Sequence, residues 1–236
     1  VSLSEGYKAG GYATYECTEP YDPEEVTSLE LGFKGSIGEG TSVNASLFRY
    51  DYTDFQVLQV VGIQTVTKNA GDATVNGLEI EALSNVNDSL SINYGLTLLD
   101  ATYGEFLNIN GIQPELGDQQ LDGNYLTNAP KVSINLGLNY TSAMSSGASL
   151  TYRANAAYKS RIYFSEFNEY SQDAYTILDL NLIWESADET MRSRFFVKNA
   201  TDEDYIAGYL SSATGGGRFG QWGYPRTVGI EIQRNF

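Results

Sequence analysis

The carboxyl-terminal segment, residues 226–236, alternates apolar and polar side chains with a period of two and stops at an aromatic residue, Phe236. In an extended strand Val228, Ile230 and Ile232 fall on one face, and Gly229 and Glu231 fall on the other. One face therefore suits an apolar environment and the other suits water. A soluble sandwich also contains single strands of this kind, so the fold depends on whether the pattern repeats.

The alternation recurs along the chain in segments close to the about 9 to 11 residues of a membrane-spanning β-strand. It is clearest in residues 89–100 and 131–141, where Ser, Asn and Gly separate apolar residues. In residues 41–53 the apolar residues change face after Leu47, which predicts a β-bulge there. We predict further strands at residues 1–9, 28–34, 78–82, 148–161, 174–185 and 195–197.

The polar face decides between a barrel and a sandwich. Its residues are Ser, Asn, Gly, Thr, Glu and Arg, which cannot form a packed core without burying unpaired polar groups. The apolar face therefore needs another cover, and in a barrel this cover is lipid. We predict an all-β fold, a transmembrane antiparallel up-and-down β-barrel wall of about ten strands that needs no helix. A soluble sandwich whose polar faces meet water is the alternative.

The connections between the predicted strands are alternately short and long. Short turns are predicted near residues 38–40, 85–88, 145–147 and 187–189, and long connections at 10–25, 103–129, 164–173 and 205–223. Outer-membrane barrels have short periplasmic turns and longer extracellular loops, so the long connections are predicted to lie outside the cell. Tyr94, Tyr140, Tyr158 and Trp184 near strand ends are consistent with an aromatic girdle or with ordinary strand propensity.

Composition excludes several classes of function. The net charge is −16, with 30 acidic and 14 basic residues, and such a chain lacks the basic footprint that nucleic acid requires. The absence of histidine removes the usual general base and every Ser-His-Asp triad. The three glycines at 215–217 lie in a predicted loop and indicate flexibility rather than phosphate binding. We therefore predict no enzyme and no cofactor.

Two smaller features are open at this stage. Most acidic residues cluster in the connections, for example at Asp202, Glu203 and Asp204, where they form either solvated loops or a site for a hard cation. Cys17 is the only cysteine, so no disulfide forms within the chain. Its thiol is either inert in a surface loop or paired outside the sequence.

The order of short motifs resembles that of the TonB-dependent outer-membrane receptors. The segment Glu5–Tyr12 is similar to the family's Gly-(Phe/Tyr)-Lys-x-Gly segment, and Pro23–Lys34 is similar to its Pro-Glu-x-x-x-x-x-Glu-x-Gly-x-Lys. Asn199 and Arg226 also lie in family-like motifs, and we interpret them as structural. The remaining similar segments are Tyr50–Gln56, Asn69–Ala73 with Gly77–Glu81, Leu126–Pro130, Val197–Tyr205 and Pro225–Thr227.

The resemblance implies a barrel of about 22 strands around an amino-terminal plug. Such a receptor lies in the outer membrane of a Gram-negative bacterium, binds a scarce nutrient, by default a ferric siderophore, and imports it with energy that TonB passes through the plug. We expect residues 1–236 to be the carboxyl-terminal part of one barrel domain, without plug, TonB box, secretory signal or earlier strands. Its partners would be outer-membrane lipid, TonB and the nutrient. A passive pore or a structural or adhesive barrel is the alternative.

Two sets of residues are predicted to serve this function. Charged residues on the polar face would meet the plug or water inside the barrel. Aromatic residues in the long loops would stack on the ligand, although they could also pack the loops together. The inward-facing set is Glu30, Glu79, Glu81, Arg153, Asp179 and Glu231, and the ligand-binding set is Tyr163, Phe167, Tyr209, Phe219 and Trp222.

Overall fold

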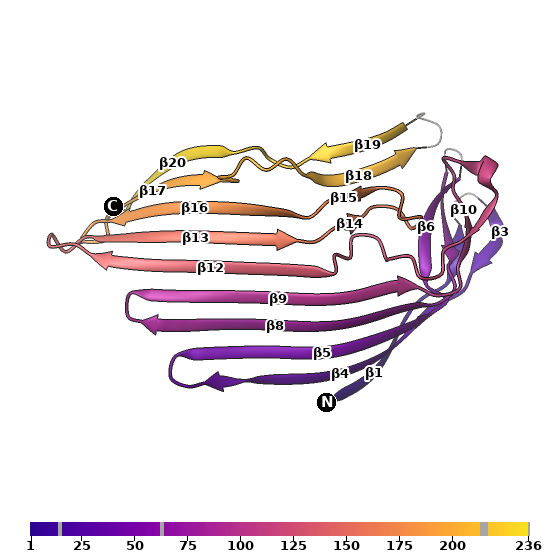
Figure 1. Ribbon diagram of the computed structural model, residues 1–236, viewed down its shortest axis with the longest axis horizontal. Helices are drawn as coiled ribbons and strands as arrows, with labels where there is room; N and C mark the ends of the chain where they lie inside the picture. Colours follow the sequence, from indigo (N-terminus) through magenta and orange to yellow (C-terminus); the bar gives the residue numbers. More distant parts are fainter. Residues whose placement is uncertain (14–15, 62–63, 213–216, 236) are drawn as a thin grey trace.

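The computed structural model describes residues 1–13, 16–61, 64–212 and 217–235. Within this part of the chain ten strands form one antiparallel sheet in the order β1-β4-β5-β8-β9-β12-β13-β16-β17-β20 (Figure 1). Their bounds are β1 Ser2–Lys8, β4 Glu24–Ile37, β5 Thr41–Thr53, β8 Ala73–Asn87, β9 Leu90–Tyr103, β12 Val132–Ala143, β13 Ser149–Lys159, β16 Tyr175–Glu185, β17 Met191–Lys198 and β20 Thr227–Arg234. Each of these strands was predicted from the sequence.

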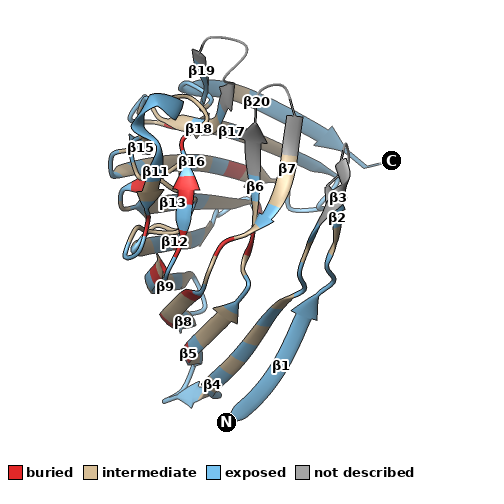
Figure 2. Ribbon diagram, turned by 90° about the vertical axis from the view of Figure 1, so that its right-hand side faces the viewer, coloured by how far each residue is buried: buried red, intermediate tan, exposed pale blue. Residues whose placement is uncertain are grey.

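The ten strands form an open arc. Figure 2, which looks from the end that carries the long loops, shows the strands following one another along a curved wall. Among the described residues β1 pairs with β4 and β20 pairs with β17, and no ladder joins β1 to β20. The sheet is therefore a segment of barrel wall with two free edges, and these ten strands do not close on themselves.

The apolar register faces away from the hollow of the arc. Leu136 is 46% exposed and lies between Tyr94 on β9 and Ala156 on β13, and Ile230 on β20 is 70% exposed. Exposed apolar side chains therefore form a row across neighbouring strands, as on the outer face of a membrane barrel. The alternation thus predicted the two faces correctly.

The prediction of a bulge near Leu47 is wrong. β5 pairs with β4 and with β8 residue by residue and without a register shift. Phe48 instead faces inward, where it is buried and packs over Gly77, which has no side chain to obstruct the ring. Tyr50 stacks on Phe48 with the ring centroids 4.8 Å apart. The apolar residues change face because aromatic rings cover the inner wall here.

The two rims of the sheet differ as predicted. Short turns join β4 to β5, β8 to β9, β12 to β13 and β16 to β17 at one end, and all the long loops lie at the other end (Figure 1). The long loops are built from hairpins of their own, and residues 54–72 form one that the sequence did not indicate. The loop elements are β2 Gly11–Ala13, β3 Glu16–Tyr21, β6 Gln56–Val61, β7 Gln64–Asn69, β10 Leu107–Ile109, the 3₁₀ turn η1 Pro114–Leu116, β11 Asp118–Gln120, β14 Ile162–Tyr163, β15 Ser171–Gln172, β18 Ile206–Ser212 and β19 Gly217–Trp222.

The packed core lies under the long loops and not inside the arc. Ala70, Tyr103, Phe106 and Leu121 are buried together, and partly buried side chains that include Phe167 pack against them. This core holds the loops of β6–β7, β10–β11 and β14–β15 against one another.

In the described part of the chain no helix is both long and apolar enough to span a membrane. The predictions for the Cys17 side chain, for Gly215 and Gly216, and for Phe236 fall outside the described residues.

Candidate functional site

A buried glutamine ties the first two loops to the rim of the sheet. The side-chain amide of Gln56 donates to the carbonyl oxygens of Ala9 and Asp22, at 3.1 Å each, and its backbone N–H donates to Glu24 Oε2 at 2.7 Å. Asn69 adds a bond from Nδ2 to the carbonyl oxygen of Asp22 at 3.0 Å. Loops more than 30 residues apart in sequence thus share one fixed base.

Asparagine side chains also join the β10–β11 loop to the β14–β15 loop. Asn168 has a positive φ of 54°, donates from Nδ2 to the carbonyl oxygen of Tyr125 at 2.9 Å and accepts from the Tyr125 N–H at 2.8 Å. Asn124 Nδ2 donates to the carbonyl oxygen of Glu166 at 2.9 Å. These bonds fix the segment 164–170 over the rim.

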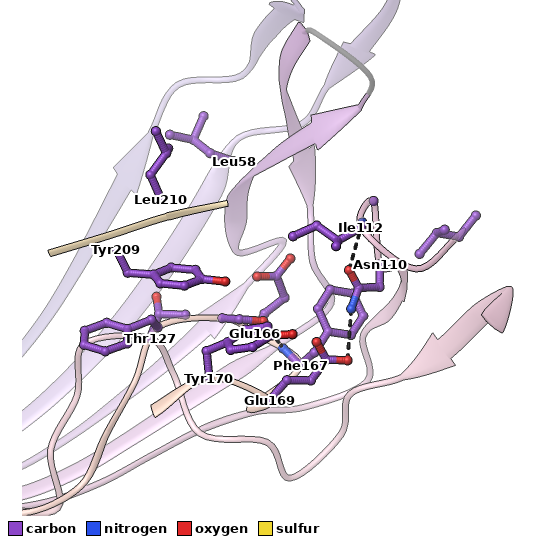
Figure 3. Close-up of a pocket in the computed structure, with 14 residues that line it drawn as sticks. Leu58, Asn110, Ile112, Thr127, Glu166, Phe167, Glu169, Tyr170, Tyr209 and Leu210 are labelled. Carbon is purple, nitrogen blue, oxygen red and sulfur yellow. Dashed lines mark hydrogen bonds between the residues drawn. The ribbon is translucent and has the colours of Figure 1, made fainter. Parts of the chain in front are cut away.

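The fixed loops line a partly open cavity of about 240 Å³ (Figure 3). Four of the loop hairpins contribute to it, those of β6–β7, β10–β11, β14–β15 and β18–β19, so its walls come from residues up to 152 positions apart, from Leu58 to Leu210. The lining residues are Leu58, Ile109 to Ile112, Thr127, Phe164 to Phe167, Glu169, Tyr170, Tyr209 and Leu210.

One wall of the cavity is a stack of aromatic rings. Tyr209 stacks on Phe164 with the centroids 5.6 Å apart and on Tyr170 with the centroids 5.5 Å apart, and the interplanar angles are 13° and 18°. The guanidinium carbon of Arg218 on β19 lies 3.9 Å from the centre of the Tyr170 ring. The stack joins the β14–β15 and β18–β19 loops and presents flat apolar surface to the cavity.

Two carboxylates lie beside these rings. Glu166 Oε1 accepts from Asn108 Nδ2 at 3.3 Å, and Glu169 Oε1 accepts from Asn110 Nδ2 at 3.0 Å. Burial raises the pKa of Glu166, and the nearby charge of Glu169 adds to this effect. The hydroxyl oxygen of Tyr209 is buried and has no hydrogen-bond partner in the described structure. Burial and the charges of Glu169 and Glu166 raise the pKa of this hydroxyl.

The structure brings together two of the five aromatic residues predicted to bind ligand. Phe167 and Tyr209 line the cavity. Tyr163 precedes Phe164 in the chain but does not line the cavity, and its ring stacks on Tyr125 with the centroids 5.8 Å apart. Phe219 and Trp222 on β19 are 55% and 68% exposed and do not line it.

The six inward-facing charges lie on the polar register as predicted. Glu231 pairs with Arg194 at 3.4 Å, and Asp179 Oδ1 accepts from the Asn199 N–H at 2.8 Å. Glu30, Glu79 and Glu81 line a shallow hollow over β4, β5 and β8. Within the described residues no ion pair involves these three carboxylates or Arg153. Whether they meet a plug stays a prediction.

Asn199 and Arg226 hold the start of β20, in accord with their structural interpretation. Asn199 is 4% exposed and donates from Nδ2 to the carbonyl oxygens of Glu203 at 2.9 Å and Tyr224 at 3.1 Å. Arg226 pairs with Asp202 at 3.2 Å. Neither residue lines the cavity.

Sequence reasoning missed Phe164, Tyr170, Glu166 and Glu169 as residues of one site. The two rings belong to the same aromatic-rich loop that supplied Tyr163 and Phe167, so proximity in sequence was the available indication. The two carboxylates resemble other loop acids. Among the described residues no group of three or more His, Cys, Asp or Glu side chains could hold a metal ion.

Comparison with known proteins places the fold. The sequence model of a family described as TonB dependent receptor-like, beta-barrel, matches residues 1–200. The ferric yersiniabactin uptake receptor FyuA from Yersinia pestis is 22% identical, with a TM-score of 0.81 over 99% of this chain and 34% of its own. The ferric preacinetobactin receptor BauA from Acinetobacter baumannii is 21% identical, with a TM-score of 0.72 over 99% of this chain and 33% of its own.

A third solved structure, the ferric citrate transporter FecA, is 19% identical, with a TM-score of 0.66 over 91% of this chain and 32% of its own. At these identities the likeness shows a shared fold. The chain spans about a third of the length of each of these proteins.

Proposed function

Because this chain belongs to the family of TonB-dependent receptor-like β-barrels, we propose that it forms the carboxyl-terminal part of an outer-membrane receptor. This receptor binds a scarce nutrient outside the cell and imports it into the periplasm. Two features together carry the proposal. The arc of strands exposes an apolar face, and the long loops at one end of it form a cavity lined by aromatic rings. In an outer-membrane barrel the long loops face the outside, where a nutrient arrives.

We take a ferric siderophore as the nutrient class. FyuA and BauA, which share the fold, are receptors for ferric yersiniabactin and ferric preacinetobactin. The stacked rings of Phe164, Tyr170 and Tyr209 offer a surface to a flat ring or conjugated group of such a ligand.

In this proposal the inner wall contacts a plug domain through which TonB supplies the energy of import. Three glutamates, Glu30, Glu79 and Glu81, and one lysine, Lys34, line the hollow over β4, β5 and β8 and leave it with net negative charge. Arg194 and Glu231 neutralise each other on β17 and β20. A plug that docks here would present basic groups to the first patch, because unpaired charges inside a barrel need partners or water. The free edges of β1 and β20 would pair with further strands of the receptor.

The proposal is tested by iron uptake in cells that carry the full-length receptor. We would supply radioactive iron as hydroxamate, catecholate and phenolate chelates, with and without functional TonB. At least one chelate should enter only when both the receptor and TonB are present. Uptake that persists without TonB would indicate a passive pore instead, and uptake of none of the chelates would remove the siderophore class.

The contribution of the cavity is tested by two matched pairs of alanine substitutions. Phe167→Ala with Tyr209→Ala removes cavity rings, and Phe219→Ala with Trp222→Ala removes exposed rings outside it. The first pair should weaken binding of the imported chelate to cells by at least about tenfold, or 1.4 kcal/mol. A larger loss of chelate affinity from the second pair would assign the capture site to β19.

A further inference from the structure

The cavity has negative charge and no positive charge in its walls. Its lining residues include Glu166 and Glu169 and contain neither lysine nor arginine. Within the described residues no ion pair involves either carboxylate. The nearest candidate cation on the aromatic stack, Arg218, lies over the Tyr170 ring and outside the lining. An anionic group that entered this cavity would meet uncompensated like charge.

The neighbours of the two carboxylates are neutral. Asn108 and Asn110 each donate one amide hydrogen bond, at 3.3 and 3.0 Å, and an amide group brings no positive charge to the carboxylate that accepts from it. The amide oxygens of the same asparagines accept from the backbone N–H groups of Ile109 at 2.9 Å and Ile112 at 3.1 Å. The cavity therefore offers two carboxylates as its charged oxygen ligands, whereas a calcium ion takes about six to eight oxygens.

The Tyr209 hydroxyl, another polar group of the cavity, can accept a hydrogen bond from a ligand donor. The buried hydroxyl of Tyr209 has no partner in the described structure, and the charges that affect it are those of Glu169 and Glu166. An N–H group that entered between them could donate to the hydroxyl oxygen and to a carboxylate. The faces of aromatic rings attract cations, and the rings of Phe164, Tyr170 and Tyr209 are stacked in this wall.

The size of the cavity limits what can enter. Its volume of about 240 Å³ is below the about 300 to 1,000 Å³ of pockets that enclose a whole drug-sized ligand. A cavity of this volume suits one arm of a larger ligand.

We propose that this cavity binds a protonated amine carried on a short aromatic or apolar arm of the imported ligand. The carboxylates of Glu166 and Glu169 pair with the ammonium group, the Tyr209 hydroxyl accepts one of its hydrogens, and the stacked rings contact the arm. This inference deepens the proposed function, since it specifies the ligand of a receptor that faces the outside. Its test measures binding alone and does not depend on import.

The probes are benzylamine, which is protonated at neutral pH, benzyl alcohol and benzoate, titrated into the purified full-length receptor by calorimetry and ligand-observed NMR. The three probes share a ring and differ in charge. Benzylammonium should bind at least about fivefold more tightly than benzyl alcohol, the size expected of an ion pair combined with a cation–π contact, and benzoate should bind most weakly.

Two charge-removing double variants complete the design. Glu166→Gln with Glu169→Gln keeps an acceptor for each asparagine. This double variant should weaken the binding of benzylammonium at least about fivefold and leave the affinity for benzyl alcohol unchanged. Glu105→Gln with Glu115→Gln removes the same charge from exposed loop positions outside the cavity and should change neither. Circular dichroism verifies that the variants fold.

Three outcomes would overturn the inference: benzoate binding as tightly as benzylammonium, no probe binding at all, or equal losses in the two double variants. Displacement of benzylammonium by millimolar calcium would assign the carboxylates to a metal ion and would overturn it as well. Loss of chelate uptake with intact benzylammonium binding would count against the proposed function only.

Discussion

At the scale of single residues, the buried carboxyl group of Glu166 destabilises the folded loop by an amount that depends on pH. Burial raises the pKa of its carboxyl group, so the folded loop disfavours the ionised form that the unfolded chain carries at neutral pH. This destabilisation is fully present above the raised pKa and shrinks as the pH falls through it. Stability of the loop therefore decreases as the pH rises across that window.

Replacing Glu166 by glutamine should remove this destabilisation of the folded loop. We expect amide hydrogen exchange in residues 164–170 to slow by about two- to tenfold at neutral pH, because the neutral side chain is cheaper to bury. The difference from the wild type, measured by mass spectrometry at matched pH, should diminish under acid conditions. Glu115→Gln, at an exposed position, is the control. Faster exchange in the glutamine variant at neutral pH would contradict the assignment.

A substitution at Gly77 tests how side chains pack on the inner wall. A β-carbon at this position would overlap the Phe48 ring, which lies over the glycine. Gly77→Ala should therefore destabilise the receptor by about 1 to 3 kcal/mol through overpacking. In the Phe48→Ala background the same substitution should cost much less, since the ring is gone. Denaturant titration in detergent micelles measures this coupling, and additive losses in the double variant would show that the ring and the glycine do not interact.

At the scale of strands, the two faces of β12 should respond oppositely to charge. Leu136 lies on the exposed apolar face, and Asn135 lies on the inward face. Arginine at Leu136 should cost about 2 to 4 kcal/mol if the residue lies near the membrane midplane, whereas arginine at Asn135 should cost little. Refolding titrations into lipid vesicles compare the two. Equal losses at both positions would be incompatible with a lipid-facing Leu136.

The strands of the wall could be predicted because their alternation depends only on the period of an extended chain and on the two solvents that it separates. Residues 41–53 show the limit. The inward ring of Phe48 breaks the alternation without breaking the pairing, since Gly77 on the neighbouring strand makes room for it. A single sequence does not show which strands are neighbours, so the glycine and the ring could not be connected.

The cavity could be predicted only in part for a related reason. Its aromatic rings were identified because rings gather in the long loops, and Phe167 and Tyr209 do line it. Glu166 and Glu169 could not be distinguished from solvated loop acids. Their placement depends on Asn108 and Asn110, which lie 58 and 59 residues away in sequence. Contacts between loops that are distant in sequence produce no periodic pattern of residues in the sequence.

At the scale of the whole molecule, apolar residues lie on one face of the sheet and charged residues lie on the other. Leu136 and Ile230 lie on the exposed apolar face, which we propose meets lipid, whereas the inward register carries Glu79, Arg153 and Glu231. Strand pairing continues across all ten strands and then stops at β1 and β20. In lipid an unpaired strand edge would leave backbone N–H and C=O groups without partners, which supports the proposal that further strands of the receptor pair with both edges.

The last prediction tests this open arc in the intact receptor, with Cys17 replaced by serine. Leu3→Cys with Leu29→Cys joins directly paired positions on β1 and β4 and should form a disulfide on oxidation. Leu3→Cys combined with cysteine at Val228, Ile230 or Ile232 on β20 should form none, because other strands separate the two edges. Peptide mass spectrometry after oxidation distinguishes the products. A disulfide between β1 and β20 at any of the three positions, formed as readily as the β1–β4 control, would mean that these ten strands close a small barrel, and the receptor proposal would then fail.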